Sequence, residues 1–145
     1  MIRLATIDDA QACYDLAKEI YGDFMLLHGI EIVEEDLRKT TDYFIKTNQV
    51  LVVERDNKVV GMTAWLLVSH PANSNCKIWQ EILWCCNSPN KIDALVLLRA
   101  IEMKANELGA DVIVLANLSL ENEPQLRRIY SKMGYQYMES HYAKH

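Results

Sequence analysis

Residues 81–98 read EILWCCNSPNKIDALVLL, and this stretch decides how the chain folds. Its first six residues are typical of a strand, residues 87–90 (NSPN) of a tight turn, and the residues from Lys91 onward of a long amphipathic helix. A strand that leads directly into a helix places backbone N–H groups at the positive end of the helix dipole. We therefore expect this turn to suit a ligand that carries phosphate groups.

The helix predicted over residues 91–108 presents one apolar stripe, and Gly109 ends it. Residues 111–117 follow as a short apolar strand of the buried, parallel type. Pro124 suits the first turn of another helix, and the tyrosine-rich residues 135–143 are predicted to form a final strand. The stripe consists of Ala94, Leu97, Leu98, Ile101, Ala105 and Leu108.

The upstream half of the chain predicts strand 2–5, helices 9–21 and 33–47, and strands 49–55, 58–69 and 76–86. A connection over 22–31, a turn at Asp56-Asn57 and a loop over 70–75 join them. The complete order predicts an α/β (mixed α+β) fold. We expect a mostly antiparallel sheet of about six or seven strands, with about four helices on its faces.

Length and composition indicate a single domain over residues 1–145, with 50% apolar and 24% charged residues. The net charge of −5 and the lack of a basic run argue against nucleic acid as a partner. No apolar run approaches the roughly 20 residues of a membrane span, and the N-terminus lacks a signal-peptide core. We therefore expect a cytoplasmic protein that does not enter a membrane.

The cysteines and histidines of the chain predict no metal site. Cys13, Cys76, Cys85 and Cys86 include no CxxC pair, and buried reduced thiols are the expected state. The four histidines are scattered without a metal-ligand spacing. Cys85 and Cys86 lack a His or Asp partner at a recognisable spacing, which argues against a nucleophilic role.

The order of elements and several short motifs resemble the GNAT superfamily of N-acetyltransferases. The resemblance covers nearly the whole chain and is sharpest from Gln80 onward, where it looks like the GNAT proteins of tailed bacteriophages. Residues 129–135 (IYSKMGY) look like the family's pattern of Tyr, two variable residues, an apolar residue, Gly and an aromatic residue. The other matching positions are Glu81, Leu83-Trp84, Leu97-Leu98, Glu102, Ala105, Gly109-Ala110, Ile113, Glu139, Tyr142 and Lys144.

The resemblance implies acetyl-coenzyme A as cosubstrate and no metal. Its pantetheine arm would lie beside the strand residues Leu83, Trp84, Cys85 and Cys86 as if it were a further strand. Backbone N–H groups of residues 84–86 would hold the thioester carbonyl. Asn117 and Ser119, just past the fifth strand, would contact the arm, although simple loop capping explains them as well. The pyrophosphate would sit on the turn and first helical residues, Asn90, Lys91, Ile92, Asp93 and Ala94.

The turn departs from the family pattern Arg/Gln-x-x-Gly-x-Gly/Ala, because only Ala94 fits within residues 89–94. Glycine lets a backbone approach a phosphate without interference from Cβ, and this turn contains none. Pro89 has no N–H to donate. Asp93 would place a negative charge near the phosphates, which Lys91 would offset.

Two residues are candidates for acid–base chemistry. Tyr130 matches the family's general-acid tyrosine, which would protonate the departing thiolate, but its place on an inner helical stripe equally fits a core aromatic. Glu81 alternates with Trp79, Leu83 and Cys85, so we expect one apolar strand face that raises its pKa and favours a general base. The alternative is an exposed glutamate near a strand start.

Two functions remain open. The first is an N-acetyltransferase that moves acetyl from acetyl-CoA to a primary amine, of a small molecule or a protein, by direct transfer in a ternary complex. The second is a catalytically inactive GNAT-fold protein, with a structural or host-interaction role in a phage. The missing glycines favour the second, whereas Glu81 and Tyr130 favour the first, towards which we lean. A homodimer through the tyrosine-rich end is also compatible with the sequence.

Overall fold

The computed structural model describes residues 1–117, 123–139 and 144. The chain forms two compact units, Met1–Leu115 and Ala116–His145. The first unit holds the sheet and three α-helices, and the second holds the helix α4 (Glu123–Lys132). Among the described residues, no helix combines the length and apolar character needed to cross a bilayer.

Within the described residues, the sheet of the first unit has five strands in the order β1-β2-β3-β4-β5, fewer than the six or seven predicted. The first three pairings are antiparallel and the β4–β5 pairing is parallel, which confirms the predicted mixed, mostly antiparallel sheet. The predicted final strand is wrong for residues 135–139, which form no strand, and its remainder, 140–143, lies outside the described residues. The strands are β1 (Ile2–Leu4), β2 (Val50–Arg55), β3 (Lys58–His70), β4 (Asn73–Cys86) and β5 (Val112–Val114).

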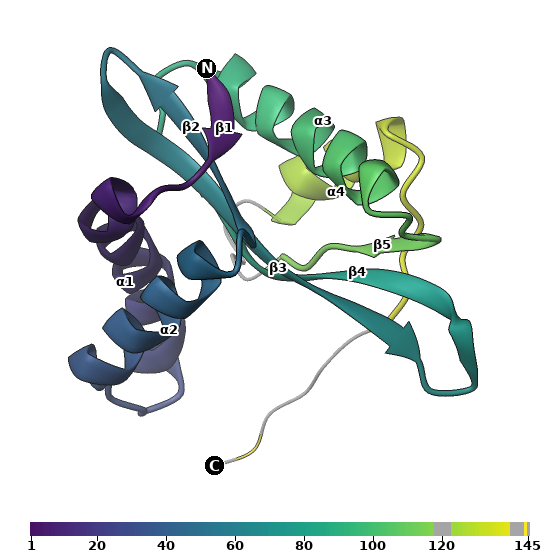
Figure 1. Ribbon diagram of the computed structural model, residues 1–145, viewed down its shortest axis with the longest axis horizontal. Helices are drawn as coiled ribbons and strands as arrows, with labels where there is room; N and C mark the ends of the chain where they lie inside the picture. Colours follow the sequence, from purple (N-terminus) through teal and green to yellow (C-terminus); the bar gives the residue numbers. More distant parts are fainter. Residues whose placement is uncertain (118–122, 140–143, 145) are drawn as a thin grey trace. The chain divides into compact units, whose positions relative to one another are not determined.

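Helices cover both faces of this sheet: α1 (Ala10–Leu27) and α2 (Glu34–Lys46) lie on one face, and α3 (Lys91–Glu107) lies on the other (Figure 1). A short 3-10 helix, η1 (Ile7–Asp9), precedes α1. The prediction that the first helix ends at residue 21 is wrong, because α1 continues to Leu27. A single internal glycine, Gly22, costs only about 1 kcal/mol in a helix. The helix stops just before Gly29, which has a φ of +65°.

Tight turns join the three long strands. Asp56 and Asn57 have φ of 50° and 59°, as a two-residue hairpin turn requires. The loop predicted over 70–75 is shorter than expected, because β3 runs to His70 and β4 begins at Asn73. This end of the hairpin is polar and exposed, so it carries none of the apolar alternation from which a strand is predicted.

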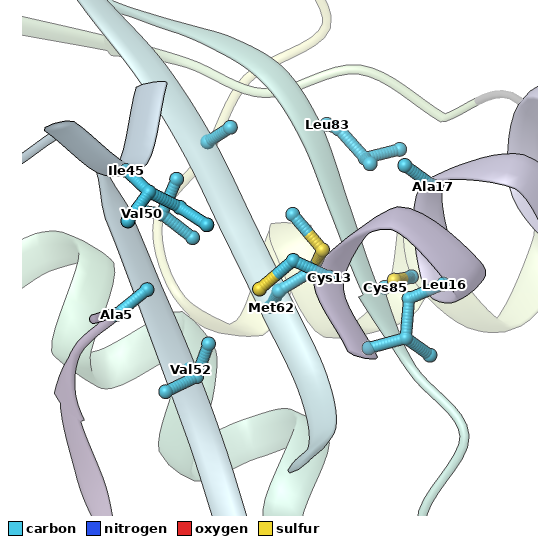
Figure 2. Close-up of a cluster of buried hydrophobic side chains, with 11 residues drawn as sticks. Ala5, Cys13, Leu16, Ala17, Ile45, Val50, Val52, Met62, Leu83 and Cys85 are labelled. Atoms are coloured by element: carbon cyan, nitrogen blue, oxygen red, sulfur yellow. The ribbon is translucent and has the colours of Figure 1, made fainter. Parts of the chain in front are cut away.

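A buried apolar cluster fills the space between α1, α2 and one face of the sheet (Figure 2). Its side chains come from α1, the end of α2, the three central strands and Ala5 just after β1, so the cluster fixes the helices on the sheet. Its members are Ala5, Cys13, Leu16, Ala17, Ile45, Val50, Val52, Met62, Ala64, Leu83 and Cys85.

The opposite face of the sheet packs against α3. Of the predicted helical stripe, Leu97, Leu98, Ile101 and Ala105 are 0% exposed. On the strands of this face, the rings of Trp65 and Trp79 stack with centroids 4.3 Å apart and an interplanar angle of 15°. This packing sets where α3 begins, and therefore where the turn that precedes it lies.

Replacing Leu98 by alanine is expected to lower the free energy of unfolding by about 2–5 kcal/mol, because a fully buried side chain leaves a cavity. The matched control is Leu95→Ala on the same helix, where the side chain is 43% exposed and the expected change is within about 0.5 kcal/mol. Urea denaturation monitored by circular dichroism measures both. Equal losses in the two variants would contradict the assigned packing face of α3.

Arg3 of β1 joins the strand edge to the start of the helical layer. Its guanidinium donates to Asp9 Oδ2 at 2.7 Å and to Asp9 Oδ1 at 2.9 Å, and its Nε donates to Glu54 at 2.9 Å. The Thr6 N–H also donates to the Asp9 carboxylate, at 2.8 Å. The hydrogen bonds from Arg3, more than those from Thr6, lower the pKa of Asp9 to about 2.

This lowered pKa predicts an acid-sensitive contribution to stability. The ordinary value for Asp9 is 3.8, so the contribution is complete above that pH and is lost as the pH falls towards about 2. Asp9→Asn is expected to flatten part of the decline of melting temperature between these pH values. Asp8→Asn, at an exposed neighbouring site, is the control and is expected to leave the decline unchanged. A decline that is identical in Asp9→Asn and the wild type would contradict the role of Asp9.

Candidate functional site

The strands β4 and β5 part within the sheet. Their parallel pairing consists of Ile78 with Val112, Trp79 with Ile113, and Gln80 with Val114. β5 ends there, whereas β4 continues for six more residues to Cys86. The β4 edge over residues 81–86 is therefore not paired with β5, and Glu81 is the first residue beyond the point where the strands part.

A β-bulge lies at the same point. Trp65 pairs with Glu81 while its neighbour Ala64 pairs with Leu83, so Ile82 is an extra residue in β4. Adjacent residues of β3 face opposite sides of the sheet, and their partners do the same. Glu81 and Leu83 therefore point to opposite faces.

This bulge corrects one prediction. Burial alternates along β4 as expected, but the single face shared by Trp79, Glu81, Leu83 and Cys85 does not exist. Leu83 and Cys85 belong to the core beneath α1, whereas Glu81 lies on the face of the stacked tryptophans. The alternative of an exposed glutamate is also wrong, because Glu81 is only 6% exposed.

Two buried side chains on the face of Glu81 have no hydrogen-bond partner among the described residues. They are Thr63, through Oγ1, and Trp79, through Nε1, and both residues are 0% exposed. Thr63 and Trp65 share a face of β3, and Trp79 and Glu81 share that face on β4. Buried polar groups are normally satisfied, so these two indicate where a water molecule or a polar ligand group fits.

Tyr21 of α1 supports the bulge, and the sequence did not point to it. Its hydroxyl donates to the backbone oxygen of Ile82 at 3.0 Å. Burial raises the pKa of Tyr21, and the negative charge of Glu81 adds to the shift. The phenol therefore remains protonated at neutral pH and holds the carbonyl of the extra residue. A tyrosine within a helix carries no local signal for such a contact.

The thiols near the end of β4 are unsuited to nucleophilic chemistry. Burial raises the pKa of Cys85 to about 12, and it also raises the pKa of Cys86. The thiolate is the reactive species, so Cys85 stays inert at neutral pH. Because Leu83 and Cys85 point into the core, only their backbone atoms are available to a ligand at the edge of the sheet.

The turn between β4 and α3 is closed by hydrogen bonds within the chain. Asn90 is the N-cap of α3: its Oδ1 accepts the Ile92 N–H at 3.1 Å, and its backbone oxygen accepts the Asp93 N–H at 3.0 Å. The Asn90 N–H donates to Ser88 Oγ at 3.1 Å, and the Asn87 N–H donates to the backbone of β3 at 2.8 Å.

Asp93 is held by an arginine from a distant strand. Arg55, at the end of β2, donates through Nε at 2.7 Å and through NH2 at 2.6 Å, and Ser88 donates its hydroxyl to the same carboxylate. The hydrogen bonds from Arg55, followed by that from Ser88, lower the pKa of Asp93 to about 2. Arg55 therefore neutralises Asp93, the part that the sequence suggested for Lys91. The two residues are 38 positions apart, and no local pattern links them.

The second unit contains the other predicted site residues. The Tyr130 hydroxyl donates to the backbone oxygen of Ala116 at 3.1 Å, and its ring lies 5.6 Å from that of Tyr135. Asn117 is partly buried. Ser119 lies outside the described residues. Glu81 belongs to the first unit, so the structure places Glu81 and Tyr130 each within its own unit.

Two surface hollows in the first unit lie away from these residues. One of about 310 Å³ lies between α1 and α2, and one of about 430 Å³ lies between α3 and the strands β1 and β2. Neither is lined by a predicted site residue. Within the described ranges, no three His, Cys, Asp or Glu residues are grouped closely enough to hold a metal ion.

Comparison with known proteins gives a clear result only at the level of structure. No protein-family model matches the sequence, and no curated protein matches it. A predicted acetyltransferase from Clostridium acetobutylicum, solved with acetyl-CoA, has a TM-score of 0.74 and 18% identity over 100% of this chain and 95% of its own.

Two further solved structures show the same likeness. A GNAT family acetyltransferase from Staphylococcus aureus has a TM-score of 0.68 and 19% identity over 100% of this chain and 97% of its own. The aminoglycoside N-acetyltransferase AAC(6′)-Iy, in complex with a CoA-containing bisubstrate analogue, has a TM-score of 0.75 and 11% identity over 100% of this chain and 97% of its own. The chain therefore has a GNAT-like mixed α+β fold, the fold of these acetyltransferases.

Proposed function

We propose that this protein is an N-acetyltransferase that moves acetyl from acetyl-CoA to a primary amine. The observation that carries the proposal is the coincidence of three features at residues 80–82: the end of the β4–β5 pairing, the β-bulge, and a buried carboxylate. An extended amide-containing ligand arm can add to such a strand edge through main-chain hydrogen bonds. The likeness to proteins solved with acetyl-CoA or CoA supports this choice of ligand.

The chemistry assigned to the chain is direct transfer within a ternary complex. The acceptor amine attacks the thioester carbonyl, whose developing negative charge is stabilised by backbone N–H groups of residues 84–86. Glu81, directly or through a water molecule, takes the proton that the amine loses. Tyr130 returns a proton to the thiolate that leaves. The net charge of −5 favours an amine acceptor that carries positive charge.

Titration calorimetry with acetyl-CoA, followed by a screen of amine acceptors for thiol release, tests the proposal. We expect saturable binding with a Kd of about 1 mM or tighter, equivalent to about −4 kcal/mol or more. We also expect thiol release that depends on both substrates. Absence of binding at millimolar acetyl-CoA and S-acetylpantetheine would exclude the acetyltransferase.

A second candidate function is favoured by the closed turn. The hydrogen bonds around Asn90 and Asp93 occupy the place where the pyrophosphate of CoA was expected. A GNAT-fold protein without catalysis, with a structural or host-interaction role in a phage, would have no use for that cradle.

Replacing Ile92 by glycine tests whether this turn still holds the pyrophosphate of CoA. Ile92 is 62% exposed at the start of α3, so its side chain is removed without creating a cavity in the core. If the turn holds the pyrophosphate, the easier approach of the backbone is expected to tighten acetyl-CoA binding by about 3-fold to 10-fold. A turn that does not hold the pyrophosphate gives no change. Leu95→Gly, on the same helix but outside the turn, is the control, and calorimetry is the measurement.

A further inference from the structure

Building on the proposed function, we infer that this protein recognises its acyl donor by the pantetheine arm and makes little use of the nucleotide. The substrate class is therefore acetyl thioesters of pantetheine in general, including donors that lack the adenosine phosphates of CoA. The observations that lead to this inference lie in the turn between β4 and α3.

Most backbone N–H groups of this turn are already engaged within the chain. Those of Asn87, Asn90, Ile92 and Asp93 have protein acceptors at 2.8 to 3.1 Å. Pro89 has no N–H to donate. A phosphate bound at a helix N-terminus needs these same donors. Binding it here would break hydrogen bonds that already satisfy the turn.

The electrostatics of the turn point the same way. The position that an anion would take at the start of α3 is occupied by the chain's own carboxylate, because Asp93 is the third residue of the helix. Two hydrogen bonds from Arg55 and one from Ser88 keep this carboxylate ionised and in place. The guanidinium is committed to Asp93, so Arg55 adds no positive charge for a pyrophosphate, and the cation that the turn itself presents is the exposed side chain of Lys91.

The other part of the expected donor site lies where β4 continues beyond its pairing with β5. β5 stops at Val114, and the β4 edge over residues 81–86 extends beyond it. The pantetheine arm carries two amides and a terminal thiol, which suits pairing with an extended strand edge. The reacting thioester would thus be held by β4, and the nucleotide would extend towards a turn that does not bind it.

The reaction needs only this part of the donor. The amine nitrogen forms a bond to the acetyl carbonyl carbon, and the carbon–sulfur bond breaks. The thiolate of pantetheine leaves with the electron pair and takes a proton, while the amine loses one. Atoms and charges balance without the adenosine phosphates, which act only through binding.

Steady-state kinetics with two donors, acetyl-CoA and S-acetylpantetheine, tests the inference on the intact protein with one amine acceptor. We expect the two kcat/KM values to agree within about tenfold, because removal of an unbound group removes little transition-state stabilisation. A preference of about 100-fold or more for acetyl-CoA would overturn the inference and leave the proposed function standing. No turnover with either donor would overturn the proposed function itself.

The variant Asp93→Asn provides a second, independent test of whether the turn excludes the nucleotide. Asp93→Asn removes the charge that holds Arg55, so the guanidinium becomes available to the phosphates of CoA. We expect the kcat/KM ratio of acetyl-CoA to S-acetylpantetheine to rise by about tenfold. The ratio compares two donors on the same folded molecules, so a general loss of stability does not move it. An unchanged ratio would show that the Asp93 cluster does not exclude the nucleotide.

Discussion

Replacing Glu81 by glutamine is expected to lower kcat for acetyl transfer by about 10²-fold to 10⁴-fold, the usual contribution of a general base. Glutamine has nearly the same shape, but its amide cannot accept the proton of the attacking amine. Glu81 is 6% exposed and lies where β4 leaves β5, so no bulk water replaces it easily. The KM for the donor is expected to change little, because the carboxylate acts on the acceptor amine.

The matched control for this change is Glu107→Gln on α3. The Glu107 side chain is 65% exposed and bonds only to Lys104 in the described part of the chain, so its kcat is expected to equal that of the wild type. Circular dichroism and melting temperature establish that both variants are folded. A kcat within about threefold of wild type in Glu81→Gln would remove Glu81 from the mechanism.

Replacing Tyr130 by phenylalanine is expected to lower kcat by about 10²-fold or more if the phenol protonates the leaving thiolate. Affinity for the donor is then nearly unchanged. The structure also supports a structural reading, in which the hydroxyl anchors the backbone at Ala116 after β5. Loss of that anchor would loosen the adjoining segment, and it would raise the donor KM more than it lowers kcat.

The division of the effect between kcat and KM decides between these two readings. Tyr137→Phe is the control, because Tyr137 is 75% exposed in the same unit. A Tyr130→Phe variant with normal kcat and a raised donor KM assigns the residue to structure. Loss of kcat with a normal donor KM assigns it to proton transfer.

Much of the fold follows from local sequence patterns. The apolar stripe of α3, the Asp56-Asn57 turn and the alternation of burial along the long strands were all predictable, because each depends on residues within a few positions of one another. The extension of α1 past Gly22 was not predicted. A single glycine such as Gly22 destabilises a helix only slightly, so it ends the helix only where the residues beyond it would add little stability.

The candidate site likewise combines features that local sequence patterns predict with features that only tertiary contacts determine. The sequence determined that Glu81 lies on β4 and that Asn90 and Asp93 open α3, because strand and helix periodicity place them. The bulge at Ile82 was decided by pairing with β3, and one extra residue reversed the face on which Glu81 lies relative to Leu83.

Only the tertiary structure decided which groups of the turn remain available to a ligand. Arg55 is 38 residues from Asp93, and Tyr21 is 61 residues from Ile82, so each contact exists because the sheet brings β2 and α1 to the end of β4. A sequence states which donors and charges a turn contains. Whether they are free or already paired depends on long-range packing, because hydrogen bonds are saturable and one donor serves one main acceptor.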